Sequence, residues 1–450
     1  MKVIEKEIQI PRKKSPGDIL TYFEENVTDA LPPGEIPVRF VITRTEDDFF
    51  FCELAVLSEI SSSISLPRSS IFDFRRRNHE SIETFNVIFI VPTGVGAEIG
   101  GHSGDAAPVA RLLAACCDTL ITHPNVVNAA DINELPENAL CIEGSVLTGL
   151  LMGTIGLQPV RANRLILIID KHLDPTFVDM AVNAASAARA AFGLNCPLVV
   201  KQQESFLMKS QYANSGRAVG IIQGLETLCD VLLEHRAHYD AAALTSLIQV
   251  PEHFHSEYFK SEIEMVNPWG GVEAMLTHAI SLLFNIPTAH APMMTSKEIQ
   301  NLKLGIVDPR KSSETISSTY LYSVLKGLHR SPRIVRDPPA FGQVGLLTVS
   351  QISCLVIPDG CVGLPTLAAI EQGIPVIAVK ENRTKMKNHL PSLGFPSGKL
   401  FIVENYLEAV GIVNALKAGI SIDSVRRPLA HTNVHPAFLS EACSGEDNLR

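Results

Sequence analysis

The sequence lacks the cysteine and leader patterns that would assign it to a metal-binding, redox or secreted class. None of its nine cysteines forms a C-x-x-C pair, which argues against a zinc ribbon or a dithiol motif. Several cysteines lie in apolar runs, where a thiol behaves as a small hydrophobe. The first residues show no apolar core of a signal peptide. We therefore expect a cytoplasmic protein with reduced cysteines.

The chain also has little charge and no long hydrophobic run. Charged residues make up 19% and hydrophobic residues 46% of its 450 residues, a balance typical of a globular protein with two or three domains. The longest apolar stretch, residues 146–160, contains three glycines and is too short to span a bilayer. The net charge of −10 argues against nucleic acid or a membrane as a partner.

From residue 85 onward, predicted strands and helices alternate, as in parallel sheets with helices on both faces. The sequence predicts an α/β protein with two Rossmann-like parallel-sheet halves facing a cleft, plus a small N-terminal α+β domain. The expected units are residues 1–80 for the small domain, 81–215 and 216–430 for the two halves, and 431–450 for a poorly ordered tail.

Two helices illustrate the local signals. Asp174 and Pro175 mark the start of one helix, and Gly193 lies just past its end. Residues 218–234 are interpreted as a second helix.

The most informative stretch is residues 86–105, NVIFIVPTGVGAEIGGHSGD. An apolar strand runs into a turn with five glycines, and Asp105 is expected to cap the helix that follows. Glycines let the backbone approach a ligand, and free amides at a helix start favour an anion. We expect a ligand-binding turn, with a purely structural turn as the alternative. The residues assigned to binding are Thr93, Gly94, Gly96, Gly100 and Gly101.

This turn matches a dinucleotide fingerprint only in part. Its spacing is G-x-G-x-x-x-G, but the fingerprint also needs an acidic residue at the end of the next strand to hold the ribose. That strand ends at Thr122 and His123. The sequence therefore argues against NAD and favours a phosphate, carboxylate or sugar ligand.

A polar segment follows the next strand, at residues 122–134, with the sequence THPNVVNAADINE. Ligands of open α/β sheets bind in the crevice at the carboxyl ends of the strands, so Asn125 and Asn128 are assigned to ligand binding. A loop in which Asn and Asp bond their own backbone is the alternative.

An enzyme acting in this crevice would need a group whose charge changes near neutral pH, and histidine is that group. A neighbouring carboxylate would orient the ring. The residues assigned to these roles are His102 or His123 for the acid–base step and Asp105, Asp131 or Glu143 for orientation.

Several His and Asp side chains after strand ends leave a divalent metal open as a cofactor. None has the tight spacing of a motif such as H-E-x-x-H. The candidate ligands are His102, Asp105, His123, Asp131, Asp170, His172 and Asp174.

A second glycine turn lies in residues 358–383, PDGCVGLPTLAAIEQGIPVIAVKENR. It resembles the nucleotide-binding half of nucleotide-sugar enzymes such as glycosyltransferases and epimerases. Those families place a ribose-binding carboxylate where this chain has Leu367 and Ala368, and an ordinary βαβ turn is the alternative. The residues assigned here are Asp359, Gly360, Gly363 and Thr366 for the ligand and Lys380 and Arg383 for its anionic group.

Two further residues stand out. Trp269, the only tryptophan, precedes a glycine pair and is interpreted either as a pocket residue or as packing beside a turn. Arg310 follows Asp308 and Pro309 and is a candidate for holding an anion.

Five motifs together resemble a bacterial and plastid family, domain of unknown function 3326. They are PTGVGAEIGGHSGDAAPVARLL, THPNVVNAADINE, NPWGGVEAMLTHA, VLKGLHRSPRI and PDGCVGLPTLAAIEQGIPVIAVKENR. The resemblance runs from about residue 85 to residue 428. It implies that these residues form one unit, but it carries over no catalytic role.

If the two glycine turns faced one another across the cleft, they would enclose an anionic small molecule. We therefore expect an enzyme acting on a phosphorylated, carboxylated or sugar-nucleotide metabolite. The alternatives are a non-catalytic metabolite-sensing or assembly protein, and a metal-dependent hydrolase or lyase. A homodimer is the default oligomeric state.

Overall fold

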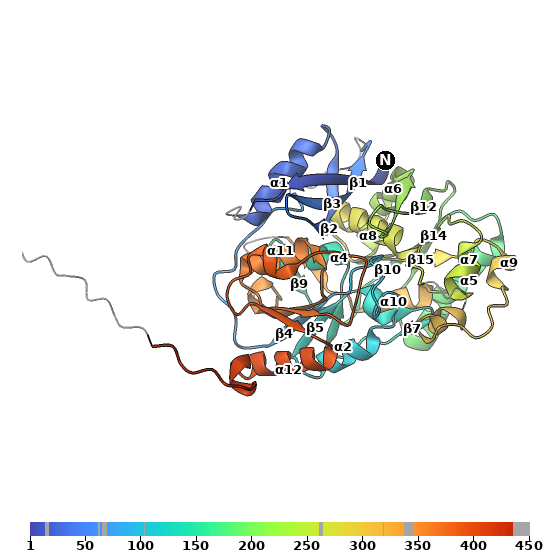
Figure 1. Ribbon diagram of the computed structural model, residues 1–450. Coiled ribbons are helices and arrows are strands. Elements are labelled where there is room, and N and C mark those ends of the chain that lie inside the picture. Colours follow the sequence, from blue (N-terminus) through green and yellow to red (C-terminus); the bar gives the residue numbers. More distant parts are fainter. Residues whose placement is uncertain are drawn as a thin grey trace, which may run out of the picture.

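The computed structural model describes residues 1–13, 18–61, 64, 70–102, 104–260, 264–317, 319–336 and 345–434. Within these residues the protein has a mixed α/β fold, with parallel and antiparallel sheets covered by helices (Figure 1). The α/β class is thus confirmed. The predicted tail, residues 431–450, lies outside the described residues from 435 onward.

An antiparallel sheet lies across the top of Figure 1, in the strand order β12-β13-β1-β3-β2-β18. Its strands are β1 (Lys2–Pro11), β2 (Ile36–Thr45), β3 (Phe49–Ser58), β12 (Leu207–Tyr212), β13 (Ala218–Gln223) and β18 (Val362–Gly363). The N-terminal strands therefore share one sheet with strands from much later in the chain. The domain boundaries at residues 80 and 215 stay predictions. Strands from the two sides of each boundary are hydrogen-bonded in this sheet, since β13 pairs with both β1 and β12.

The larger parallel sheet has the order β20-β19-β17-β4-β5-β8. Its strands are β4 (Asn86–Phe89), β5 (Thr119–Thr122), β8 (Ala139–Cys141), β17 (Ile352–Pro358), β19 (Val376–Val379) and β20 (Leu400–Val403). All four residues of β4 are buried, as expected of a central strand covered on both faces.

The smaller parallel sheet has the order β11-β10-β14-β15. Its strands are β10 (Leu165–Ile169), β11 (Leu198–Lys201), β14 (Ala241–Leu247) and β15 (Thr288–Met293). In sequence, this whole sheet falls between β8 and β17 of the larger sheet. The prediction of two consecutive Rossmann-like halves is therefore not confirmed, since the larger sheet takes strands from both sides of the smaller one.

Helices cover both faces of each parallel sheet. On the larger sheet, α2 (Ala107–Ala114) and α12 (Tyr406–Lys417) pack on one face, and α4 (Gly144–Leu151) and α11 (Leu364–Gln372) on the other. On the smaller sheet, α5 (Pro175–Ala187) and α10 (Leu321–His329) share a face. Helix α8 (Gly270–Phe284) lies between the smaller sheet and the antiparallel sheet.

The remaining elements are short or peripheral. They are α1 (Ile19–Ala30), α3 (Pro124–Val127), α6 (Leu225–Glu234), α7 (Phe254–Lys260), α9 (Lys297–Gln300), β6 (Asn128–Ala129), β7 (Ile132–Asn133), β9 (Gly156–Gln158) and β16 (Arg333–Val335), with short 3-10 turns and a π turn between elements. No helix in the described part of the chain is long and apolar enough to cross a membrane.

The two illustrative helices have opposite outcomes. Asp174 caps α5 by accepting a hydrogen bond from the amide of Thr176, and Gly193 ends the helical segment in a left-handed conformation, as predicted. The predicted helix over residues 218–234 is wrong, because β13 and α6 divide it. Gly224 adopts φ 78° between them, a conformation that stops a helix.

Candidate functional site

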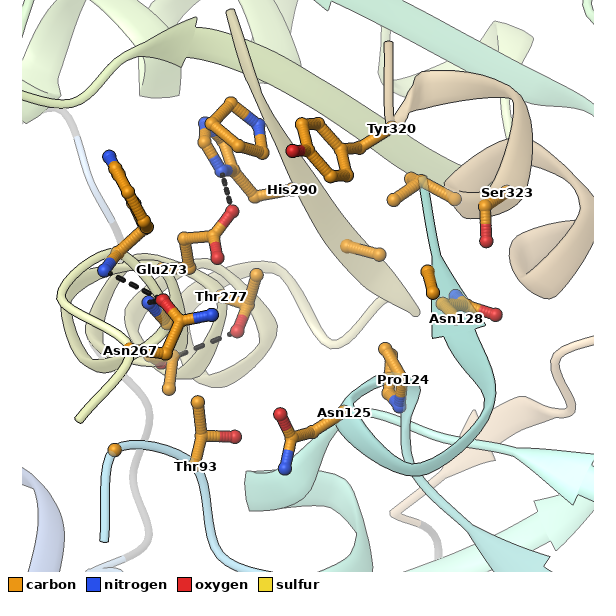
Figure 2. Close-up of a pocket in the computed structure, with 18 of the residues that line it drawn as sticks. Thr93, Pro124, Asn125, Asn128, Asn267, Glu273, Thr277, His290, Tyr320 and Ser323 are labelled. Carbon is orange, nitrogen blue, oxygen red and sulfur yellow. Dashed lines mark hydrogen bonds and ion pairs between the residues drawn. The ribbon is translucent and has the colours of Figure 1, made fainter. Parts of the chain in front are cut away.

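The carboxyl end of the larger parallel sheet opens onto a cleft beside β15, the edge strand of the smaller sheet, and this cleft contains a cavity of about 190 Å³ that we call the first chamber. The larger sheet contributes Thr93, His123 and Glu143, which follow β4, β5 and β8. The opposite wall includes Glu273 on α8 and His290 on β15. Figure 2 shows side chains from both sides pointing into this space. The chamber thus occupies the position where open α/β sheets bind ligands.

A second chamber, of about 180 Å³, adjoins the first. The two share Thr93, His123, Gly144, Ala274 and His278 in their lining. The second chamber is mostly apolar, and its walls include Val38, Phe40, Leu147, Ile155, Leu282 and Leu364. A ligand at the junction would contact both chambers at once.

His278 and Glu143 meet at this junction from opposite sides of the cleft. The Nδ1 atom of His278 lies 2.7 Å from Oε1 of Glu143, although the ring is not aligned for a hydrogen bond. Glu143 also caps α4 by accepting the amide of Ser145 at 2.8 Å. Burial raises the pKa of Glu143, but His278 and Ser145 outweigh burial and hold that pKa below its ordinary value. Glu143 is therefore a carboxylate at neutral pH.

His123 lines both chambers but is held by the backbone. Its Nε2 atom accepts a hydrogen bond from the amide of Val91 at 3.2 Å. Burial lowers the pKa of His123 to about 4, although Glu143 opposes this effect. A pKa of about 4 keeps the ring neutral near pH 7, so burial opposes the charge change on which its acid–base assignment rests, and that assignment stays a prediction.

Glu273 is held in the first chamber by a buried histidine. Nδ1 of His290 lies 2.9 Å from Oε1 of Glu273, and Nε2 lies 2.8 Å from Oγ of Ser246. This order of groups resembles a catalytic triad, but Ser246 is completely buried and lines neither chamber. The chain of contacts therefore positions the Glu273 carboxylate, which faces the cavity in Figure 2.

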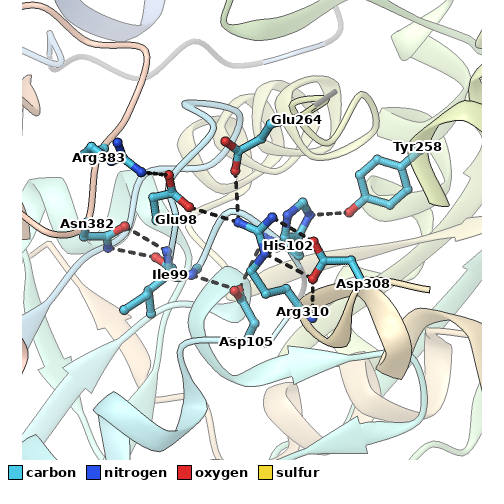
Figure 3. Close-up of polar contacts among 11 residues, drawn as sticks. Glu98, Ile99, His102, Asp105, Tyr258, Glu264, Asp308, Arg310, Asn382 and Arg383 are labelled. Carbon is cyan, nitrogen blue, oxygen red and sulfur yellow. Dashed lines mark hydrogen bonds and ion pairs between the residues drawn. The ribbon is translucent and has the colours of Figure 1, made fainter. Parts of the chain in front are cut away.

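His102 and Asp105 belong to a buried network beside the glycine turn (Figure 3). Nδ1 of His102 lies 2.7 Å from the hydroxyl of Tyr258, and burial, with a smaller effect of Lys311, lowers the pKa of His102 to about 4. Oδ1 of Asp105 accepts the amides of Gly100 at 2.8 Å and His102 at 3.3 Å. Burial raises the pKa of Asp105 to about 7.

Asp105 does not cap α2, so that prediction is wrong. The cap position is Ala106, without a side-chain hydrogen bond, because the Asp105 carboxylate turns back to close the glycine turn.

The predicted anion-binding cations pair with carboxylates instead. Arg310 contacts Glu98, Glu264 and Asp308 at 2.8–3.1 Å. Arg383 also reaches Glu98, at 2.8 Å, and its side chain is 80% exposed. Lys380 lies 2.6 Å from Glu404. None of these cations lines either chamber.

The structure brings part of the predicted site together. Lining the first chamber are Thr93, Gly94, Gly101, His123, Asn125, Asn128 and Glu143, and lining the second are Thr93, His123, Gly363 and Thr366. The residues that line neither chamber are Gly96, Gly100, His102, Asp105, Asp131, Asp359, Gly360, Lys380 and Arg383. Asp131 instead accepts a hydrogen bond from the hydroxyl of Ser317.

The two glycine turns are neighbours rather than opposite walls of an interdomain cleft. They follow β4 and β17, which pair directly in the larger sheet. Both contribute to the second chamber. The expectation that they face one another from two halves is wrong, because one sheet carries both.

The metal candidates do not converge. In the described ranges, no group of three or more His, Cys, Asp and Glu side chains is arranged to hold a metal ion. Both ring nitrogens of His172 lie 3.0 Å from backbone carbonyl oxygens, those of Asp174 and Met294.

The most informative residues that sequence reasoning did not assign are on α8. Glu273, Thr277 and His278 all line the first chamber, and Thr277 donates a hydrogen bond to Glu143 at 3.3 Å. Glu273 and Thr277 are four residues apart and so share one helix face, and His278 follows Thr277 directly. These polar residues in an otherwise apolar helix are the sequence signal that could have identified them. Trp269 also lines this chamber, in agreement with one of its two sequence interpretations, that of a pocket residue.

The fold and the cleft define an α/β protein with a two-chamber cavity. The chain belongs to the family described as "Protein of unknown function (DUF3326)", which matches residues 86–426, and this confirms the resemblance seen in the five motifs.

One similar protein, from Synechococcus sp., is described as an uncharacterized lipoprotein. It is 33% identical over 338 residues, which cover 74% of this chain and 91% of that relative. No solved structure matches the chain. The cytoplasmic location and the homodimer stay predictions.

Proposed function

We propose that this protein is an enzyme that binds an anionic small metabolite across both chambers, with His278 and Glu143 as its acid–base pair. The observation that carries the proposal is the 2.7 Å contact between Glu143, in the first chamber, and His278, which lines both chambers. A carboxylate this close to one ring nitrogen stabilises the charged imidazole by Coulomb attraction, which supports a general base.

The surroundings of His278 suit this role. Its side chain is 14% exposed, so the ring is shielded from bulk water but open to the chambers. Nε2 of His278 has no hydrogen bond to any residue that the structure describes, and it is therefore available to a ligand. A Cβ atom at position 144 would lie 3.0 Å from Cε1 of His278, so glycine there leaves room beside the ring.

In the proposed reaction, Nε2 of His278 takes a proton from the ligand or returns one to it. Glu143 stays ionised and balances the positive charge that forms on the ring. Glu273, positioned by His290 at 2.9 Å, supplies a second carboxylate that can accept a hydrogen bond from the ligand. Thr93 and Asn125 offer neutral polar groups from the opposite wall.

Ligand binding can be tested by thermal shift across nucleotides, sugar phosphates, small carboxylates and divalent metal ions. A ligand at a hundredfold its Kd stabilises the folded state by about 2.7 kcal/mol, so a binder should raise the Tm visibly. The catalytic claim is tested by incubating the protein with the binders and following product formation by mass spectrometry.

His278→Gln and Glu143→Gln should each abolish turnover while far-ultraviolet circular dichroism stays unchanged. His253→Gln is the matched control, because His253 lies just before α7 with a 61% exposed side chain and lines neither chamber. Binding without turnover in the unmodified protein would favour a metabolite sensor, and equal turnover in all three variants would contradict the assignment.

A further inference from the structure

The two chambers differ in the sign of the charges that line them. Among the described residues, the acidic side chains of the first chamber are Glu143, Glu273 and Glu314, and no Lys or Arg lines it. The second chamber is lined by Arg39, Arg217 and Arg336 and by no Asp or Glu. An anionic group would be repelled by the first chamber and attracted by the second.

Two of these arginines are already neutralised by buried carboxylates. Arg39 lies 2.9 Å from Glu5, and Arg217 lies 2.6 Å from Glu5 and 3.1 Å from Glu53. The structure thus provides two carboxylates for two guanidinium groups, and this cluster contributes little net charge to the chamber.

Arg336 differs from both. Its Nε atom donates to Oδ1 of Asn285 at 2.6 Å, but neither Nη atom has a hydrogen bond or ion pair with a described residue. Asn285 ends α8 in a left-handed conformation with φ 54°, which places its side chain where it holds the guanidinium. Within the described part of the chain, Arg336 is thus a positioned cation with no partner on its bidentate face, the arrangement that suits a carboxylate or phosphate.

Apolar walls separate this cation from the acid–base pair. The second chamber is bounded by aliphatic and aromatic side chains from β2, α4 and α8, such as Phe40, Leu147 and Leu282. It is continuous with the first chamber at Thr93, His123 and His278. A ligand that reaches both ends must therefore present an apolar body to these walls.

We propose that the second chamber binds the apolar body of an amphipathic anion, with its carboxylate or phosphate on Arg336 and its other end beside His278. This inference rests on the proposed function for the identity of the reacting end. It adds the substrate class, which is an acid with an apolar chain rather than a nucleotide or a sugar phosphate.

The test measures affinity along a series of straight-chain alkanoates from acetate to decanoate, by isothermal titration calorimetry on the full chain. Octanoate should bind at least tenfold more tightly than acetate, since each buried methylene contributes, and more tightly than octanol, which lacks the charge. Octyl phosphate compared with octanoate distinguishes the two anionic groups.

Variants of Arg336 isolate the charge. Arg336→Gln should weaken octanoate binding at least tenfold and leave octanol binding within twofold, while Arg336→Lys should retain part of the octanoate affinity. Thr148, on α4, lines the chamber, so Thr148→Leu should weaken decanoate more than hexanoate. Thr148→Val, of equal size, is the control.

The outcomes separate this inference from the proposed function. Affinity that is independent of chain length, or unchanged in Arg336→Gln, would overturn the inference even if short anions bind in a His278-dependent manner. Tight octanoate binding that needs Arg336, in a protein whose turnover is unaffected by His278→Gln, would support the inference and contradict the proposed function.

Discussion

Glu143 and His278 approach one another from opposite walls of the cleft, with Oε1 and Nδ1 2.7 Å apart. Glu143 follows β8 of the larger parallel sheet, and His278 is on α8, which covers the smaller one. The same contact therefore forms the centre of the proposed site and connects the two walls of the cleft. The two side chains that form this contact can be replaced singly and together.

The first prediction is that this pair stabilises the fold as well as the site. Glu143→Gln should lower the free energy of unfolding by about 1–3 kcal/mol. The buried Glu143 carboxylate accepts the Ser145 amide and contacts His278, and the substitution alters both interactions. The double variant Glu143→Gln/His278→Gln should cost less than the sum of the singles, with a coupling of about 0.5–3 kcal/mol. Urea denaturation of the four proteins measures this cycle, and strictly additive values would show that the side chains do not interact.

The second prediction concerns His123, whose ring accepts the buried amide of Val91. His123→Ala should lower the free energy of unfolding by about 1–3 kcal/mol, because that amide loses its partner. His253→Ala, at an exposed position just before α7, should change the free energy of unfolding by less than about 0.5 kcal/mol. An unchanged free energy of unfolding in His123→Ala would contradict this prediction, because water or a neighbouring group would then replace the ring as the acceptor of the Val91 amide.

The third prediction is a pH dependence that arises from Asp105. Its pKa is raised to about 7 by burial, so the folded state holds this proton more tightly than the unfolded chain does. The contribution of the protonated Asp105 to the free energy of unfolding is fully present below the ordinary Asp pKa and is lost as the pH rises toward 7. Its size is on the order of 4 kcal/mol at most.

Asp105→Asn should remove this dependence. His102 and His123 act in the opposite direction, because their lowered pKa values stabilise the protein above pH 6.5 and are lost as the pH falls toward 4. The difference between the unmodified protein and Asp105→Asn therefore isolates Asp105. The free energy of unfolding of the unmodified protein, relative to that of Asp105→Asn, should decrease between pH 4 and 7. Parallel pH profiles of unfolding free energy for the two proteins would refute this prediction.

The fourth prediction compares two glycines within helices. A Cβ atom at position 271, on α8, would lie 1.9 Å from the carbonyl oxygen of Ala218, so Gly271→Ala must push α8 away from β13. We expect a loss of more than about 2 kcal/mol. Gly411, inside α12, has nothing within 4 Å, and Gly411→Ala should stabilise the protein by about 0.5–1 kcal/mol. Thermal and urea unfolding of both variants checks the contrast.

The sequence predicted elements whose signals are local. The strand and turn at residues 86–105 and the capped helix at Asp174 each depend on neighbours within a few residues, and the structure has both. The helix predicted across Gly224 is wrong, because six of its residues pair with β1 and β12. Such pairing is a long-range property that overrides local propensity.

The site was predictable only on one side. His123 and Glu143 follow strand ends, where α/β sheets bind ligands, and both line the first chamber. His278 is 135 residues from Glu143 in sequence, and only the packing of α8 over the cleft brings the two together. Arg336 follows a short strand and has no motif around it, so its role depends on the chamber that the folded chain forms.

The most direct test of the account is a crystal structure of the protein with the alkanoate or metabolite that raises its Tm most. We predict electron density for the ligand at the junction of the chambers, with one end beside Nε2 of His278 and the anionic end on Arg336. Density at any site away from the two chambers, with both of them occupied by solvent alone, would contradict the account.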